Sequence, residues 1–108
     1  VSDEQIKGVA RNMIKYFRAG SPKAKLIWVA TTPHTERAKP VKATGDLNPV
    51  VLRINRLTAE VMKEEGIPVV DLYALLIDRL ALAGGDGYHW SREAYSMISA
   101  ELFKSLGL

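Results

Sequence analysis

The sequence contains no cysteine in its 108 residues and no long apolar run. The absence of cysteine excludes disulfides, thiolate metal sites and a cysteine nucleophile, and it leaves the cellular compartment open. No stretch approaches the roughly 18 consecutive apolar residues of a membrane-spanning helix, so we expect no membrane span. The sequence begins at Val1 rather than Met and shows no secretory signal pattern.

The chain also lacks a strong excess of charge. Its formal net charge is +3, and its lysines and arginines are dispersed along the predicted helices. Dispersed basic residues are typical of a solvated surface, so we expect no nucleic-acid partner. A hydrophobic content of 47% with 25% charged residues is ordinary for a globular domain, and the length allows one domain at most.

Two long amphipathic helices are predicted before residue 67. Ser2 and Gln5 form a capping-box pattern that begins a helix over 3–19. Asn48 is the expected N-cap of a second helix, which Gly66 ends. Their expected buried faces comprise Ile6, Val9, Ala10, Met13, Ile14 and Phe17 in the first helix, and Val50, Ile54, Leu57 and Val61 in the second.

Two further helices are predicted in the C-terminal third. Asp71 is expected to cap the first of them, and Ser91 the terminal one. The expected core positions are Leu72, Leu75, Leu76 and Leu80 in the first, and Ala94, Tyr95, Ile98, Leu102 and Leu106 in the second.

Two short apolar runs, residues 25–30 and 67–72, predict strands that are covered on both faces, as in parallel sheets. Because helices alternate with them, the expected class is α/β, with two parallel strands and four helices. Two parallel strands alone leave each strand at an edge, which makes the sheet incomplete. We expect further strands from an upstream segment, from a second copy of the chain or from a separate fragment.

The stretch 84–91 carries the chemistry. Glycines at 84, 85 and 87 are expected to take positive φ and turn the chain sharply. Asp86 and His89 can then meet across the turn, and the carboxylate would fix the imidazole tautomer so that its other nitrogen can accept a proton. This is the base-and-orienter part of a nucleophilic triad. A solvated surface turn is the alternative, and the spacing alone favours it.

The segment Asp86-Gly87-Tyr88-His89-Trp90-Ser91 resembles the C-terminal block of the SGNH (GDSL-type) hydrolases, in which an Asp precedes the catalytic His by three residues. Residues 26–33 resemble the strand and Thr-Thr-Pro exit loop of that family. Residues 48–66 resemble its next helix, and 67–73 its next strand. The resemblance implies the C-terminal part of a three-layer α/β/α, flavodoxin-like sandwich and the hydrolysis of small esters, acylated sugars among them.

The resemblance assigns catalysis to His89 and Asp86. The exit loop borders the substrate pocket in that family, which implies substrate contacts from Thr32, Pro33 and His34. Tyr88 and Trp90 flank His89 and are expected to form pocket walls or to pack under the terminal helix.

The Gly-Asp-Ser nucleophile block, the oxyanion glycine and the Gly-x-Asn-Asp block of that family are all absent from this sequence. Gly45-Asp46 is followed by Leu47 instead of Ser, and Asn48 is followed by Pro49. We therefore expect residues 1–108 to form a single partial domain, which supplies His and Asp and is inactive alone. The chain's own serines are poor nucleophiles, because Ser91 is needed as a cap and Ser96, Ser99 and Ser105 lie within the terminal helix.

Three alternatives stay open. Residues 31–47, made locally basic by His34, Arg37, Lys39 and Lys42, form either a ligand-binding loop or a solvated one. A metal site of His34, Asp86 and His89 is the weakest alternative, since no helical His spacing supports it, so no metal or cofactor is expected. The alternative function is a non-catalytic module that forms a homodimer or binds a partner through its open sheet edge.

Overall fold

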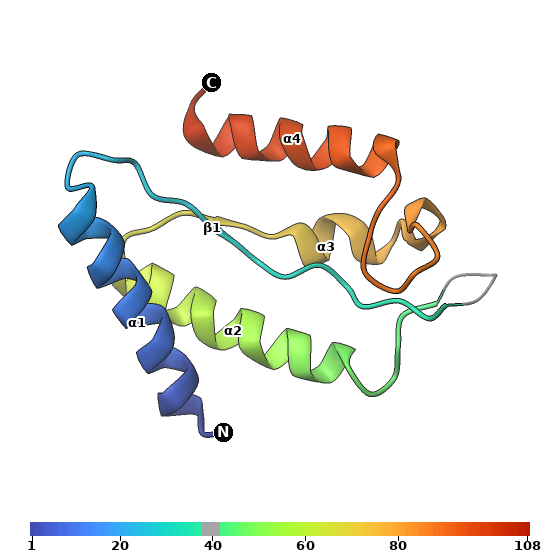
Figure 1. Cartoon of the computed structure of the whole chain (residues 1–108), viewed down its shortest axis with the longest axis horizontal. Coiled ribbons are helices and arrows are strands. Elements are labelled where there is room, and N and C mark those ends of the chain that lie inside the picture. The colour runs from blue at the N-terminus through green and yellow to red at the C-terminus, as the bar shows by residue number, and fades with distance from the viewer. Residues whose placement is uncertain (38–41) are drawn as a thin grey trace.

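Two short parallel strands lie between helices in a computed structural model that describes residues 1–37 and 42–108 (Figure 1). The elements, in chain order, are α1 Asp3–Gly20, β1 Trp28–Val29, α2 Asn48–Glu65, β2 Val69–Val70, α3 Leu72–Ile77, the 3₁₀ turn η1 Leu80–Leu82 and α4 Arg92–Leu106. In Figure 1, α1 and α2 lie on one side of the strand pair and α4 on the other. The predicted α/β class, with four helices and an incomplete sheet, is confirmed. Lys39, predicted to make its loop basic, lies outside the described residues.

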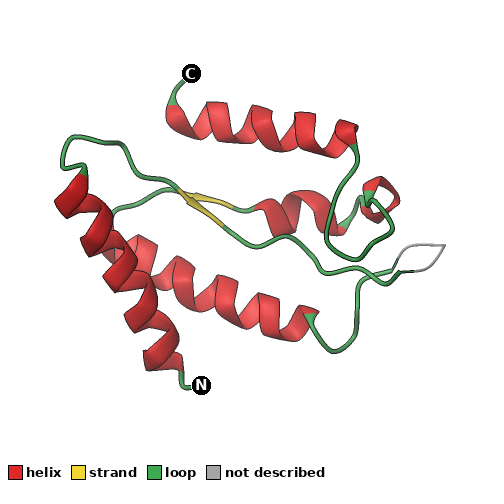
Figure 2. Ribbon diagram, viewed as in Figure 1, coloured by secondary structure: helices red, strands yellow, loops and turns green. Residues whose placement is uncertain are grey.

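The strands are shorter than the six-residue runs that predicted them. Trp28 lies opposite Val69, and Val29 opposite Val70. The N–H of Trp28 donates to the Pro68 carbonyl at 2.9 Å, and the N–H of Ala30 donates to the Val70 carbonyl at 3.0 Å. Each strand has one neighbour in the described part of the chain, so only the centre of each run is held in a ladder (Figure 2).

The first helix begins as predicted and packs against the second. The Gln5 N–H donates to Ser2 Oγ at 3.1 Å, and the Ser2 N–H donates to Gln5 Oε1 at 2.8 Å, which completes the capping box. The apolar contact between α1 and α2 consists of buried residues Ala10, Ile14, Val61 and Met62, with Ile67 beside them and Leu26 and Trp28 packed against the cluster.

Half of the apolar stripe on α1 is not buried. Val9, Met13 and Phe17 are 62%, 41% and 50% exposed, so the prediction that they belong to the core is wrong. Because α2 covers only the side of α1 that carries Ala10 and Ile14, the adjoining stripe faces outward. On α2, Val50 and Ile54 are exposed, because the contact with α1 is made by Val61 and Met62 instead.

The overall dimensions agree with this open packing. The chain measures 45 × 36 × 19 Å, and its radius of gyration is 15.1 Å, whereas a compact domain of this length has one of about 13 Å. Its accessible surface is 7096 Å², against about 5,900 Å² for a compact protein of this mass. The molecule is a thin slab with apolar surface left uncovered.

Local capping differs from the prediction at one helix. Leu47 precedes α2 as N-cap without a side-chain bond, while Asn48 is the first helical residue, with a buried side chain that turns toward the preceding loop. Asp71 caps α3 through the Ala74 N–H, and Ser91 caps α4, both as predicted.

The C-terminal elements build a second apolar cluster. It contains buried Leu76, Trp90 and Ala94, with Leu75, Leu80, Leu82, Ala83 and Ile98 partly buried around them. The predicted third helix is divided into α3 and η1, and Tyr95 on α4 is exposed rather than buried. Trp90 belongs to the loop 84–91, so this cluster packs the end of that loop against α3 and α4.

Replacing Leu76, which is fully buried, by Ala should lower the free energy of unfolding by about 2–5 kcal/mol, because a cavity would form in this cluster. Leu52→Ala on α2 is the matched control, since Leu52 is 48% exposed, and it should cost less than about 1 kcal/mol. Urea unfolding followed by circular dichroism measures both, and equal losses would contradict this account of the core.

Candidate active site

The glycine-rich loop is closed at its base by backbone hydrogen bonds. Ala83 and Trp90 form an antiparallel bridge. The N–H of Gly84 donates to the His89 carbonyl at 2.7 Å, and the N–H of Ser91 donates to the Leu82 carbonyl at 2.7 Å. Residues 84–90 therefore form a tight loop between η1 and α4.

Two of the three glycines in this loop need a positive φ. Gly85 has φ 86° and Gly87 φ 93°, as predicted, whereas Gly84 does not have a positive φ, which corrects that part of the prediction. Gly84 is instead required by close approach, because a Cβ there would lie 3.0 Å from the His89 carbonyl oxygen.

Asp86 and His89 face each other across the turn, as the sequence predicts. Asp86 Oδ1 accepts from the N–H of Tyr88 at 2.9 Å and from the N–H of His89 at 2.8 Å. Asp86 Oδ2 contacts His89 Nδ1. No hydrogen bond involves Nε2 in the described part of the chain, and the His89 side chain is 75% exposed. The imidazole is thus oriented through one nitrogen and offers the other.

These bonds also set the charge of the carboxyl group. The backbone N–H of His89, its imidazole and the N–H of Tyr88 together hold the pKa of Asp86 well below its usual value of 3.8. Because the pKa of Asp86 is lowered in the folded state, its carboxylate stabilises the folded loop at pH values above the usual pKa of the group. That contribution is lost as the pH falls through the lowered pKa, so Asp86 stays ionised at any pH where an imidazole can act as a base.

The long loop before α2 is hydrogen-bonded to the glycine-rich loop. Glu36 N–H donates to the Lys42 carbonyl at 2.8 Å, which forms a small hairpin. From this hairpin the N–H of Thr35 donates to the Gly87 carbonyl at 3.1 Å, and Arg37 Nε donates to the Asp86 carbonyl at 3.1 Å. In the sequence, Arg37 is recognisable only as a basic loop residue and Thr35 carries no signal, because nothing in their spacing points to a contact about fifty residues away.

The predicted substrate-contact residues occupy different environments. Tyr88 is 61% exposed, and its ring meets that of His34 edge to face, with centroids 4.8 Å apart. Thr32 and His34 are half-buried, while Pro33 is fully buried. Trp90 is buried with Leu76 and Ala94, which corresponds to packing under the terminal helix. Of these residues, Tyr88 is the exposed one, and it is in ring contact with half-buried His34.

The described residues hold no cluster of three or more His, Asp or Glu side chains that could bind a metal ion. No helix in the described ranges is long and apolar enough to cross a membrane. The hydroxyl of Ser91 accepts from the Ala94 N–H at the start of α4, so it serves as a helix cap.

The strand and helix order, together with the closed loop that presents Asp86 and His89, is that of an α/β fold of the SGNH type. Residues 1–102 match the family of GDSL-like lipases and acylhydrolases, and this chain belongs to that family. The resemblance read from the loop sequence is thereby confirmed.

Two solved structures share the fold. One is the esterase domain of the ORF1 protein from the zebrafish ZfL2-1 retrotransposon, with a TM-score of 0.83 and 21% identity. It is matched over 100% of this chain and 65% of its own, so this chain spans less than two thirds of that domain. The other has a TM-score of 0.70 and 25% identity, over 94% of this chain and 51% of its own. No curated protein sequence matches this chain.

Gly87→Ala should lower the free energy of unfolding by about 1–3 kcal/mol, since alanine is strained at this φ and its Cβ would lie 3.0 Å from the Thr35 carbonyl oxygen. Gly45→Ala is the control, because nothing lies within 4 Å of a Cβ there, and its effect should stay within about 0.5 kcal/mol. Thermal unfolding of both variants tests this, and an unchanged Gly87→Ala protein would contradict the described loop.

Proposed function

We propose that this chain supplies the His-Asp part of a Ser-His-Asp triad in an ester hydrolase. The observation that carries the proposal is the contact between Asp86 and His89 Nδ1, which leaves Nε2 accessible on a loop held by backbone bonds. Membership of the GDSL-like acylhydrolase family supports the same chemistry. The substrate class is a small carboxylic ester, including acylated sugars.

In the proposed reaction, His89 Nε2 removes the hydroxyl proton of a serine as the serine oxygen attacks the ester carbonyl. The imidazolium then donates this proton to the leaving alcohol, and an acyl-serine forms. Water repeats the sequence, with His89 as base and then acid, to release the carboxylic acid and regenerate serine. Asp86 holds the reactive tautomer and stabilises the imidazolium, and the steps use no cofactor.

The serine and the oxyanion donors are proposed to come from residues outside these 108. The sequence has no Gly-Asp-Ser block, and the hydroxyl of Ser91 is engaged in capping α4. In residues 1–37 and 42–108 the sheet has two strands, each with one neighbour. A two-stranded parallel sheet is normally extended by further strands, which supports a single partial domain that further residues complete.

The residues proposed to border the substrate are Thr32, Pro33, His34, Tyr88 and Trp90. Exposure favours Tyr88 for direct contact, because it precedes His89 and is 61% exposed, while half-buried His34 meets its ring edge to face. Pro33 and Trp90 are buried and would shape the wall from behind.

The test is ester hydrolysis, measured with p-nitrophenyl acetate. Residues 1–108 alone should show negligible turnover and should not be labelled by a fluorophosphonate, which reacts with activated serines. When the chain is joined to or mixed with a segment carrying a Gly-Asp-Ser block, activity should appear, and His89→Ala should lower kcat by about a thousand-fold or more.

Ser99→Ala is the control in the same assay, because Ser99 lies on α4 and has no part in the proposed reaction; its turnover should be unchanged. A reading of the coding sequence upstream of Val1 would show whether such a block lies in the same polypeptide. Retained turnover in the His89→Ala protein would remove His89 from the mechanism.

A second candidate function, self-association as a homodimer, is favoured by an apolar groove beside β1. One part of the groove, about 310 Å³, lies between α1 and β1 and includes Met13, Phe17 and Val29. A second part, of about 400 Å³, shares Met13 and Trp28 with it and extends toward Val9. The surface excess of roughly 1,100 Å² over a compact protein is comparable to the about 800 Å² that each partner buries in a stable interface.

If a second copy covers this groove, light scattering during size-exclusion chromatography should give the mass of a dimer, and Phe17→Ser should shift it to a monomer. Phe103→Ser is the matched control, since Phe103 on α4 is 55% exposed but lies outside the groove, and it should remain dimeric. A wild-type chain that stays monomeric at every accessible concentration would rule out the homodimer.

A further inference from the structure

Asn48 makes more polar contacts than a helix-start residue requires. The residue as a whole is 5% exposed. Oδ1 accepts from the His34 N–H at 3.1 Å, while Nδ2 donates to the His34 carbonyl at 2.7 Å and to the Thr44 carbonyl at 2.9 Å. His34 and Thr44 lie opposite each other at the base of the hairpin, which we call the hairpin neck. The Asn48 amide thus joins both sides of this neck to the start of α2.

This hairpin is in turn bonded to the glycine-rich loop. His34 Nδ1 lies 3.1 Å from Thr44 Oγ1, which fixes the ring that meets Tyr88. The next residue, Thr35, donates its N–H to the Gly87 carbonyl at 3.1 Å. Gly87 lies between Asp86 and Tyr88, and the N–H of Tyr88 donates to the Asp86 carboxylate.

We propose that Asn48 is a positioning residue for the Asp86–His89 pair and acts through the segment His34–Thr35 and the Gly87 carbonyl. An apolar side chain at position 48 would leave the part-buried His34 N–H and Thr44 carbonyl without their partner, whereas the His34 carbonyl would keep its bond from the Thr44 N–H at 3.0 Å. Polar groups shielded from water are costly to leave unpaired. The hairpin neck would then open toward solvent to hydrate them and would withdraw the Thr35 N–H from Gly87. This proposal rests on the proposed triad, but its test does not involve ester hydrolysis.

The chain contains a matched control in Asn55, seven residues further along α2. Asn55 clamps the same loop by the same chemistry, because Oδ1 accepts from the Thr31 N–H and Nδ2 donates to the Thr31 carbonyl, each at 2.9 Å. In the described ranges, no hydrogen bond joins Thr31 to residues 84–90. Asn48→Leu and Asn55→Leu each remove an amide that pairs with the N–H and carbonyl of one loop residue, His34 or Thr31. Asn48→Leu also removes the bonds to Thr44, and only Asn48 connects to the site.

The experiment follows two NMR signals of the 108-residue chain over pH, the Asp86 carboxyl ¹³C and the His89 imidazole ¹⁵N. In the unaltered chain the Asp86 midpoint should lie below the usual 3.8, and neutral His89 should carry its proton on Nδ1. In Asn48→Leu the midpoint should rise toward 3.8, and the Nε2–H tautomer should appear. Arg37, the charged group whose Nε contacts the Asp86 carbonyl, is present in every variant.

Asn55→Leu should also reduce thermal stability, by less than Asn48→Leu because it removes two hydrogen bonds rather than four, yet it should leave both NMR signals unchanged. Equal signals in the two variants would overturn the proposal, whether or not the chain proves to be part of a hydrolase. If Asn48→Leu does not fold, Thr44→Val decides the question, because it removes only the hydroxyl that contacts Asn48 Nδ2, at 3.2 Å, and His34 Nδ1. An upward shift of the Asp86 midpoint in Thr44→Val supports the proposal, and an unchanged midpoint rejects it.

Discussion

The carboxylate of Asp86 is the group on which the arrangement of the site depends. A single negative charge accepts two backbone N–H bonds from the residues that follow it, and its second oxygen meets the imidazole of His89. Backbone donors to a carboxylate fix a turn and stabilise the charged form together. The same bonds therefore shape the loop, keep Asp86 ionised and select the nitrogen of His89 that faces outward.

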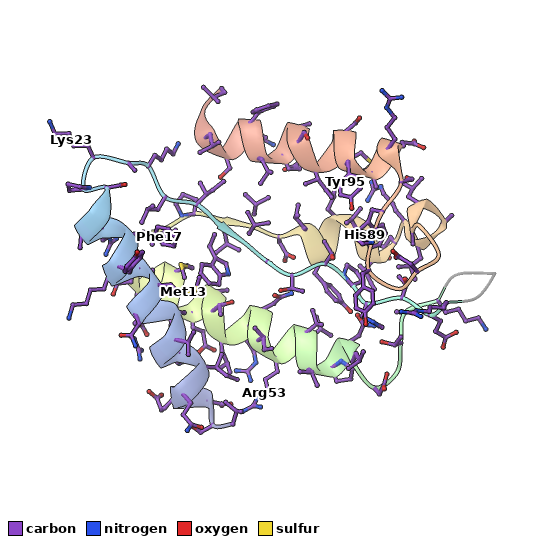
Figure 3. All side chains as sticks on the ribbon, in the orientation of Figure 1. Met13, Phe17, Lys23, Arg53, His89 and Tyr95 are labelled. Carbon is purple, nitrogen blue, oxygen red and sulfur yellow. The ribbon has the colours of Figure 1, made fainter. Side chains whose placement is uncertain are left out.

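The second constraint is the single neighbour of each strand. Because β1 and β2 pair only with each other in the described chain, the ladder is two residues long and the helices cover it incompletely. The apolar stripe of α1 is wider than the surface that α2 offers, which leaves Val9, Met13 and Phe17 exposed. Site and open surface lie apart, with His89 near one end of the molecule and Met13 beside the strands (Figure 3).

Features that depend on neighbouring residues were predicted well. The capping box of Ser2, the caps at Asp71 and Ser91 and the end of α2 at Gly66 all involve partners within four residues. Burial was predicted less well, because a periodic stripe shows that a face is apolar but not what covers it. Asn48 shows the same limit. Asparagine is a residue type that suits a helix cap, but the amide of Asn48 is hydrogen-bonded to His34, fourteen residues earlier in the chain.

By itself, the sequence determined the helices, the two strand positions, the family and the pairing of Asp86 with His89, since each is encoded in local spacing or in a short motif. Only the tertiary structure decided how that pair is supported. The contact of Arg37 with Asp86 joins residues 49 positions apart, and that of Asn48 with His34 joins residues 14 apart. Such bonds depend on how α2 and the strands bring distant segments together, and no local periodicity carries that information.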